Sequence, residues 1–436
     1  MAHTLSITYG STTIDLTLVD RTPKSAPASE PTVTGYWEVH ISAATSELLV
    51  EEIHKINRAF EQARQRQDDP FLDRVYLNFL PKDLTDSQRS EILNGNIEFY
   101  DETLKYAWAN NAVDLRLAIK RRNYWEGALT PIPLTNSNGT DVTSGLILYN
   151  CNDGDGSSPN IRENFADIDG ADLKGDLPAP IKIKLVMPYI PNYEVFPIIL
   201  INNRGDPTSI VHMIEGEDAM TSNTDADCSG GEYGYASWTT TIEAILISLN
   251  TSSFDSFEGG RWYLPFLRLQ SIPTIADLWL RIYRGPLYPG TEWINYPATG
   301  GPQIIQFPPL RIGVPEINGM TIPGWVKVKT STTGTKTLNV DYIGFIPFDG
   351  VRYYEFGYIS LSDPYSIMID DPYINQAYEI QYSSPYTEVP LLMHGTALEV
   401  VPNRNARVYL LLAGTTAKVS IGSTLQLWYR PRRLSL

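Results

Sequence analysis

The side chains that could perform acid–base, nucleophilic or metal chemistry form no recognisable catalytic motif. The sequence holds no phosphate-binding loop, dinucleotide-binding glycine pattern, zinc-protease motif or nucleophile elbow. The five histidines lie too far apart to predict a zinc site. They are His3, His40, His54, His212 and His394. The adjacent carboxylates of Asp370 and Asp371 could supply an acid and a base for glycoside hydrolysis, as could Asp225 with Asp227. We expect a non-enzymatic protein and keep glycan hydrolysis as a minor hypothesis.

The chain is acidic, and most of the acidity lies in one stretch. Its 436 residues carry 50 Asp and Glu against 34 Lys and Arg, a formal net charge of −16. Residues 141–260 hold 19 acidic and 5 basic residues, whereas residues 401–436 hold 6 basic residues and no acidic one. Nucleic-acid binding needs clustered Lys and Arg, so no nucleic-acid partner is expected. The uneven charge indicates either solvated surfaces, or an acidic stretch that takes a cation or partner and a basic end that docks on a neighbouring subunit.

The composition favours a mainly β protein. The chain has 26 Tyr, 13 Phe, 9 Trp, 31 Gly and 31 Pro, and only 19% of its residues are charged. No apolar run is long enough to span a membrane, and the first residues do not resemble a signal peptide. The two cysteines, Cys151 and Cys228, are too few for a disulfide scaffold; we expect free thiols, with one bridge between them as the alternative.

Residues 1–130 are expected to form a small N-terminal α+β assembly domain. Alternation over residues 5–19 predicts a hairpin that turns at Gly10 and Ser11. Apolar residues spaced four and three apart over residues 49–63 predict a helix, with Thr45 or Ser46 as its cap. A capping-box pattern from Thr85 to Gln88 predicts a second, short helix that ends near Gly95. Residues 113–120 alternate as a half-buried strand does.

The rest of the chain divides by composition into three further parts. Residues 131–175 are rich in Pro, Asn, Ser, Gly and Asp, and are predicted to be a linker with loops. Residues 176–385 show short strands with turns between them, as in an antiparallel β-sandwich or jelly roll. Residues 386–436 are predicted to be a C-terminal β segment, either closing the sandwich or forming an arm with a basic end.

Within the predicted sandwich, several short motifs resemble, in order, those of the galactose-binding-like fold of carbohydrate-binding modules. The matching segments are His212–Ala219, Cys228–Gly234, Gly259–Leu269, Leu278–Ile282 and Leu338–Pro347. They include a Glu-x-Glu strand, a Ser-Gly-Gly-x-Tyr motif and an Asp-Tyr-Ile strand. The resemblance covers about 130 residues and implies a jelly roll that recognises sugars.

This resemblance also implies a structural calcium ion. The positions that match the family's calcium ligands are Glu215, Glu217 and Asp341. Calcium prefers several hard oxygen ligands, and carboxylates at positions i and i+2 of a strand share one face. The alternative interpretation is an exposed edge strand whose carboxylates are solvated.

Sugar recognition in such modules uses aromatic rings. The candidates for stacking against a glycan are Trp238, Trp262, Tyr263 and Trp293. Because an aromatic residue at strand spacing in a sandwich commonly packs inward, the alternative is that these rings belong to the core.

The overall layout resembles minor tail and baseplate proteins of tailed bacteriophages, including distal-tail-like proteins. A small N-terminal domain ends at Tyr124–Gly127, a jelly roll opens with Gly-Asp-Leu-Pro-Ala-Pro at residues 175–180, and the chain finishes with Tyr429–Leu434. The resemblance implies a virion structural protein that assembles in the host cytoplasm. Its partners would be further copies of itself in a ring or fibre and other tail proteins. The alternative function is adhesion through recognition of a host surface glycan.

Overall fold

The computed structural model divides the chain into two compact units, and the larger unit is inserted into the smaller one. Unit 1 comprises Met1–Thr130, Lys174–Ala179 and Tyr429–Leu436, and unit 2 comprises Pro131–Leu173 and Pro180–Trp428. The structure describes residues 4–19, 31–81, 85–99, 111–137, 139–141, 144–149, 163–188, 195–203, 212–225, 228, 231–238, 243–249, 261–271, 275–283, 290–298, 303–312, 324–330, 333–355, 365–381, 387–414 and 422–434. The predicted mainly β fold, with one small α+β part at the N-terminus, is confirmed.

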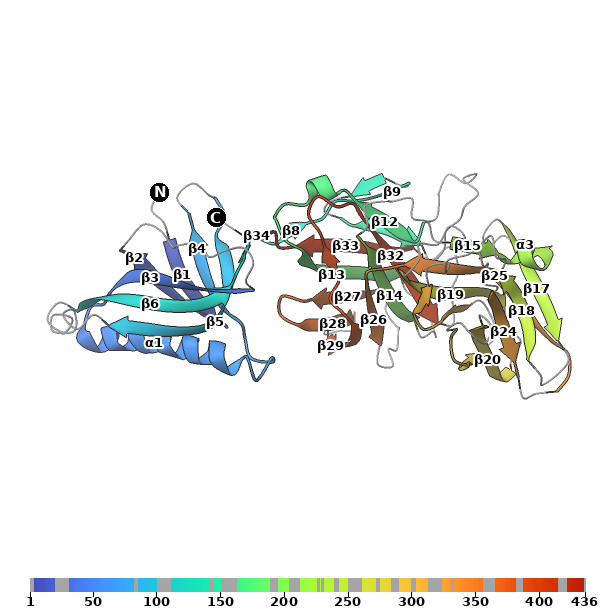
Figure 1. Cartoon of the computed structure of the whole chain (residues 1–436), viewed down its shortest axis with the longest axis horizontal. Coiled ribbons are helices and arrows are strands. Elements are labelled where there is room, and N and C mark those ends of the chain that lie inside the picture. The colour runs from blue at the N-terminus through green and yellow to red at the C-terminus, as the bar shows by residue number, and fades with distance from the viewer. Residues whose placement is uncertain are drawn as a thin grey trace, which may run out of the picture. The chain divides into compact units, whose positions relative to one another are not determined.

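Six strands of unit 1 close into an antiparallel ring (Figure 1). The elements of unit 1 are β1 (Thr4–Tyr9), β2 (Thr12–Leu18), β3 (Thr32–Ser42), α1 (Ser46–Gln65), β4 (Val75–Leu80), β5 (Gln88–Phe99), β6 (Ala112–Arg122), β7 (Trp125–Glu126) and β34 (Arg432–Arg433). Their pairing order is β1-β2-β3-β6-β5-β4, and β4 pairs again with β1. Closure pairs each of these six strands on both sides, so unit 1 is a small barrel without an open edge among them.

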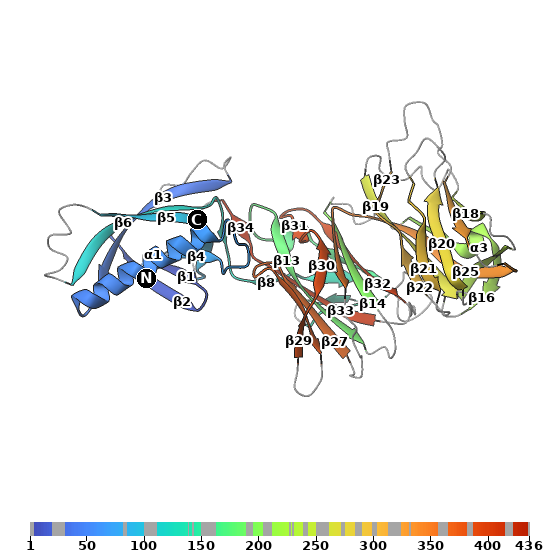
Figure 2. The ribbon, with the colours of Figure 1, turned by 90° about the horizontal axis from the view of Figure 1, so that it is seen from below.

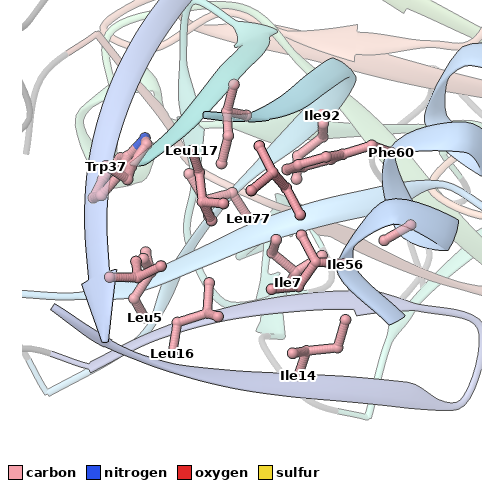
Figure 3. Packing of buried hydrophobic residues seen from close by; sticks show 14 of the residues in the cluster. Leu5, Ile7, Ile14, Leu16, Trp37, Ile56, Phe60, Leu77, Ile92 and Leu117 are labelled. Atoms are coloured by element: carbon pink, nitrogen blue, oxygen red, sulfur yellow. The ribbon is translucent and has the colours of Figure 1, made fainter. Parts of the chain in front are cut away.

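The single long helix of unit 1 packs along the barrel as its sequence predicts. The Thr45 hydroxyl accepts a hydrogen bond from the Leu48 backbone N–H at 3.3 Å and caps α1. The apolar face of α1 is buried, and in Figure 3 its Ile56 and Phe60 point toward Ile7 and Ile92 of the strands. The Phe60 ring lies against Gly95 of β5, at a position where any β-carbon would overlap the ring. Gly95 therefore lets the helix approach the sheet closely.

One predicted helix of unit 1 is a strand instead. Residues from Gln88 onward form β5, which pairs with β4 on one side and β6 on the other. Ser90 and Ile92 point inward and are buried, whereas the alternate residues Arg89 and Glu91 are partly exposed. The alternation of buried and exposed residues favours a strand over the short helix that the capping-box pattern predicts. In the strand, β4 and β6 supply backbone hydrogen-bond partners that a short helix would not have.

The last part of the basic C-terminal end, from Tyr429 onward, belongs to unit 1 of its own chain, whereas Arg404 and Arg407 belong to unit 2. β34 pairs with β7, and the buried carboxylate of Glu126 accepts hydrogen bonds from Arg432 at 3.1 and 3.2 Å and from Arg89 at 3.2 and 3.3 Å. The Arg432 guanidinium also lies over the Tyr124 ring, 4.4 Å from its centroid. The prediction of an arm that reaches a neighbouring subunit is therefore wrong for Arg432, because its charge is satisfied within unit 1.

Unit 2 has two parts. The strands of the first part come before and after those of the second part in the sequence. The strands of this first part are β8 (Thr130–Pro131), β9 (Leu134–Asn136), β10 (Gly139–Asp141), β11 (Leu146–Tyr149), β12 (Phe165–Ile168), β13 (Ala179–Pro188), β14 (Val195–Asn202), β26 (Gly350–Glu355), β27 (Tyr365–Asp371), β28 (Gln376–Gln381), β29 (Thr387–Pro390), β30 (Leu392–Gly395), β31 (Glu399–Val400), β32 (Ala406–Gly414) and β33 (Gly422–Tyr429), with a short 3-10 turn at Gly170–Asp172. One sheet runs β11-β33-β13-β27-β28-β29, and β14, β26 and β32 belong to a second sheet. Ile198, Ile199, Leu200 and Ile201 of β14 are all buried, so this second sheet is covered on both faces.

The second part of unit 2 is a β-sandwich formed by residues 212–347 (Figure 2). Its elements are β15 (His212–Glu215), α3 (Gly216–Ala219), β16 (Thr221–Thr224), β17 (Glu232–Trp238), β18 (Ala244–Leu249), β19 (Arg261–Ser271), β20 (Ile275–Tyr283), β21 (Ile294–Ala298), β22 (Gln303–Gln306), β23 (Leu310–Ile312), β24 (Gly324–Lys329) and β25 (Lys336–Pro347). A four-stranded sheet, β18-β24-β20-β21, faces β17, β19 and β25, and one apolar cluster contains residues of both layers. The segment whose motifs resemble the galactose-binding-like fold thus forms two facing layers, and one of them continues through the pairing of β22 with β32 into the first part of unit 2.

Two predicted boundaries differ from the structure. The segment predicted as a linker, residues 131–175, contributes β9 to β12 to the sheets of unit 2. Residues 386–436, predicted either to close the sandwich or to form an arm, contribute β32 and β33 to the interior of the same sheets, which agrees with the first alternative and removes the boundary at residue 386. Both differences have one cause: strands far apart in sequence pair with each other, as β12 does with β32, and local composition does not report such pairing.

Candidate functional site

The carboxylates predicted to bind calcium do not share a strand. Glu215 is the last residue of β15, and the chain then turns into α3, which contains Glu217. Gly216 permits this turn: a β-carbon there would overlap the carbonyl oxygen of Val340 and approach the backbone of Gly234. The predicted i, i+2 arrangement on one strand face is therefore wrong, because the backbone leaves the strand between the two glutamates.

The third predicted calcium ligand, Asp341, is fully buried and forms an ion pair with the equally buried Arg268. Asp341 sits where the pairing of β19 with β25 shifts register, which turns its side chain toward the arginine. Among the residues that the structure describes, no three His, Cys, Asp or Glu side chains gather into a group able to hold a metal ion. The calcium site stays a prediction without support from this geometry.

Glu217 is nevertheless an unusual carboxyl group. Its Oε2 atom is buried and has no hydrogen-bond partner within the described part of the chain. Burial raises the pKa of Glu217, a hydrogen bond from its own backbone N–H opposes the rise, and the negative charges of Asp218 and Glu232 add to it. Folding therefore makes this carboxyl harder to ionise than it is in the unfolded chain.

We expect Glu217→Gln to stabilise the protein at pH 7 and to have no such effect in acid. A carboxyl whose pKa is raised by folding costs stability when the pH lies above the folded pKa. The cost disappears once the pH falls below the unfolded pKa. Melting temperatures of both proteins at pH 7 and pH 4 test this, with the exposed Glu388→Gln as control. A lower melting temperature of Glu217→Gln in millimolar calcium would contradict the expectation and support the calcium site.

Two of the four aromatic residues predicted to stack on a glycan lie in the core. Trp238 and Tyr263 are 7% and 1% exposed, and both belong to the apolar cluster between the two layers of the sandwich. Each occupies an inward-facing position of its strand, which agrees with the alternative that these two rings belong to the core. Trp262, one position away from Tyr263 on β19, is 49% exposed. Trp293, just before β21, is half-buried.

Trp293 belongs to a layer of rings and cations on the outer surface of the four-stranded sheet. We define this layer as the cation–aromatic face, formed by Trp279, Arg281 and Tyr283 of β20, Lys327 and Lys329 of β24, and Trp293. The intervening residues Leu278, Leu280, Ile282, Val326 and Val328 are buried in the sandwich core. Strand alternation thus sends apolar side chains inward and the face outward.

Pairing of β20 with β24 sets the geometry of this face. Trp279 lies opposite Lys329, and Arg281 lies opposite Lys327. The Lys329 Nζ atom is 4.3 Å from the centroid of Trp293 and 5.4 Å from that of Trp279. The Arg281 guanidinium carbon is 4.5 Å from the centroid of Trp293 and 4.8 Å from that of Tyr283. These distances are those of cation–π contacts.

One carboxylate accompanies the cations. Glu243, just before β18, accepts hydrogen bonds from Arg281 at 3.0 and 3.1 Å and from Lys327 at 2.9 Å. The hydrogen bond from Lys327 is the main cause that lowers the pKa of Glu243, burial opposes it, and the charges of Arg281 and Lys327 add to it. Glu243 therefore stays ionised and bridges β20 and β24.

Sequence reasoning identified Trp293 and missed the rest of this face. The signal was present as period-two spacing, Trp279-x-Arg281-x-Tyr283 and Lys327-x-Lys329. This spacing indicates one shared surface only once β20 and β24 are known to be neighbouring strands.

The adjacent carboxylates considered for glycoside hydrolysis are committed to buried ion pairs. Asp370 accepts hydrogen bonds from Arg352 at 2.8 and 3.4 Å and from the Tyr354 hydroxyl at 2.8 Å. Asp371 pairs with Lys182 at 2.7 Å. Burial first, and the negative charge of Asp370 next, raises the pKa of Tyr354 well above its usual value, so Tyr354 remains a donor. This arrangement stabilises the fold rather than presenting an acid and a base to a substrate.

The chain matches no protein-family model, curated protein or solved structure. No helix within the described ranges is long and apolar enough to cross a membrane.

Proposed function

We propose that the chain is a non-enzymatic structural protein of a bacteriophage tail or baseplate, and that unit 1 assembles it into a homo-oligomer. The observation that carries the proposal is an aromatic side chain held in the open by an ordered loop of unit 1. Phe71 follows α1 and is 90% exposed. Aromatic side chains, phenylalanine among them, are enriched at protein interfaces relative to the rest of the surface.

The loop that presents Phe71 is fixed by its neighbours. The Arg66 side chain donates hydrogen bonds to the carbonyl oxygens of Pro70, at 2.7 Å, and Leu72. The Phe71 backbone N–H donates to the Asp69 carboxylate at 3.0 Å. Little conformational entropy remains to be lost on binding, which favours association. Because the aromatic ring has no cover within its own unit, we assign it to contact with a second copy of the chain.

The layout supports a tail role. A small closed barrel receives both ends of the described chain, and a larger β-rich unit is inserted into it. The resemblance of this layout to distal-tail-like proteins points the same way, and implies other tail proteins as neighbours, assembly in the host cytoplasm and location in the virion.

We expect Phe71→Asp to weaken self-association of the full chain at least tenfold. The substitution places a charge where the apolar contact forms, and the exposed position leaves folding unaffected. Light scattering after gel filtration, over a range of protein concentrations, measures the effect. Ile374→Asp is the control, because Ile374 is 56% exposed but lies in a turn of unit 2. Unchanged assembly of Phe71→Asp, or equal loss in both variants, would refute the assignment.

A second proposed function is recognition of a surface carbohydrate by unit 2. It is favoured by the three half-buried rings Trp279, Tyr283 and Trp293 on one outer sheet surface. Aromatic rings at a solvent-facing surface provide the apolar platform on which a sugar ring can stack. This function is compatible with a tail role, because a tail protein can bind the host surface.

A further inference from the structure

We propose that the cation–aromatic face binds an anionic polysaccharide. This inference rests on the carbohydrate-recognition proposal and adds the charge of the ligand. It depends on three properties of the face: an excess of positive charge, a lysine held in place by rings without a carboxylate partner, and regular spacing set by strand pairing.

The positive charge of the face exceeds its negative charge. Arg281 and Lys327 share the single carboxylate of Glu243. Lys329 contacts the rings of Trp279 and Trp293 and makes no ion pair with any described residue. Even with the exposed neighbour Glu292 included, three cations stand against two carboxylates. This local excess occurs in a chain whose net charge is −16, so the face offers an anion a positive site on an otherwise acidic protein.

The cations are fixed at regular positions. Lys327 and Lys329 are two residues apart on one strand, which places their α-carbons about 6.6–6.8 Å apart on the same surface. Arg281 lies opposite Lys327 on the neighbouring strand. Contacts with Tyr283 and Trp293 restrict the arginine and lysine side chains, so binding costs less side-chain entropy than at a surface of mobile lysines.

Rings and cations together match a charged sugar better than either alone. A pyranose presents an apolar C–H surface that packs on Trp279, whose ring has a cation at 5.4 Å, whereas Tyr283 and Trp293 have cations at 4.1–4.8 Å. Its carboxylate reaches Lys329, Lys327 or Arg281. A polymer with one charge on each sugar repeats this pattern along the row of cations. A neutral glycan would leave the charge of Lys329 without a partner, and a polyanion without sugar rings would not use the aromatic surface.

Binding of the full chain to three probes by titration calorimetry tests the inference. The probes are alginate oligosaccharides, which combine sugar rings with carboxylates; neutral dextran oligosaccharides; and inorganic polyphosphate. We expect the wild type to prefer alginate by at least tenfold over both others, and to lose affinity as salt rises. Lys329→Gln and Trp293→Ala should each weaken alginate binding about tenfold. Lys329→Arg, which keeps the charge and the stacking, should bind as the wild type does. Lys336→Gln on β25 is the control, because it removes a lysine from the opposite layer of the same sandwich.

The outcomes distinguish this inference from the two functions proposed above, carbohydrate recognition and assembly. Equal binding of dextran and alginate would overturn the anionic ligand but keep carbohydrate recognition. Equal binding of polyphosphate and alginate would overturn the sugar class. No binding to any probe, or wild-type affinity in Lys329→Gln, would overturn the site. The self-association of Phe71→Asp is measured separately, so the assembly proposal stands or fails independently.

Discussion

Replacing Asp370 with asparagine is expected to destabilise unit 2 by about 3–5 kcal/mol, a typical cost of breaking a buried ion pair. Asp370 and Arg352 are both buried, and they join β27 of one sheet to β26 of another. Asparagine would leave the Arg352 guanidinium buried without a counter-charge. Burial lowers the pKa of Arg352, and the hydrogen bond and charge of Asp370 outweigh it; without Asp370 the burial penalty on the charged guanidinium is no longer offset by its partner.

The Asp370→Asn experiment needs a control for the loss of any carboxylate. Chemical denaturation of the wild type, Asp370→Asn and Glu388→Gln provides it, because Glu388 is an exposed carboxylate in the same sheet. Glu388→Gln should change the free energy of unfolding by less than about 0.5 kcal/mol. The double variant Asp370→Asn with Arg352→Met should recover part of the loss, since it no longer buries an unpaired charge. A cost below about 1 kcal/mol for Asp370→Asn would show that this pair does not hold the two sheets together.

Phe60→Ala is expected to destabilise unit 1 by about 3–5 kcal/mol. Phe60 is buried at the contact of α1 with β5, where its ring fills the space above Gly95. Alanine would remove the largest of the buried side chains by which α1 contacts the barrel. The cavity would be bordered by paired strands, which cannot move inward to fill it.

The partner of Phe60 supplies a complementary test. Gly95→Ala should cost about 1–3 kcal/mol, because the added methyl group overlaps the ring. Combining Gly95→Ala with Phe60→Leu should cost less than the sum of the two single changes, since the smaller side chain gives the methyl group room. Thermal unfolding of the full chain, followed by the loss of helical circular dichroism, reports on unit 1. Strict additivity would mean that the two side chains do not share this space.

Local features of unit 1 could be predicted because short-range rules decide them. The spacing of Leu49, Ile56 and Phe60 and the capping hydroxyl of Thr45 determine α1 within a few residues. The hairpin of β1 and β2 turns at Gly10, whose φ of 53° favours glycine. The helix predicted from Thr85 is wrong because the strand that forms instead, β5 between β4 and β6, depends on neighbours far away in sequence.

The candidate site could be predicted only in part for the same reason. Trp293 was predicted because its residue type, an aromatic ring able to stack on a sugar, is evident from the sequence. Lys329 was not, because its importance comes from its position beside β20. Asp341 was assigned to calcium on the basis of its motif, whereas the structure pairs it with Arg268, 73 positions away in a strand whose register the sequence does not reveal. Burial of a charge and identity of its partner are properties of the folded chain.

The central claim, that unit 1 builds a homo-oligomer for a virion tail, is tested most directly by the native mass of the purified full chain. Native mass spectrometry should show one assembly with a fixed number of copies of the 48.9 kDa chain, and electron microscopy should show it as a ring or fibre. A monomer at every concentration, with no larger particle in the images, would contradict the account.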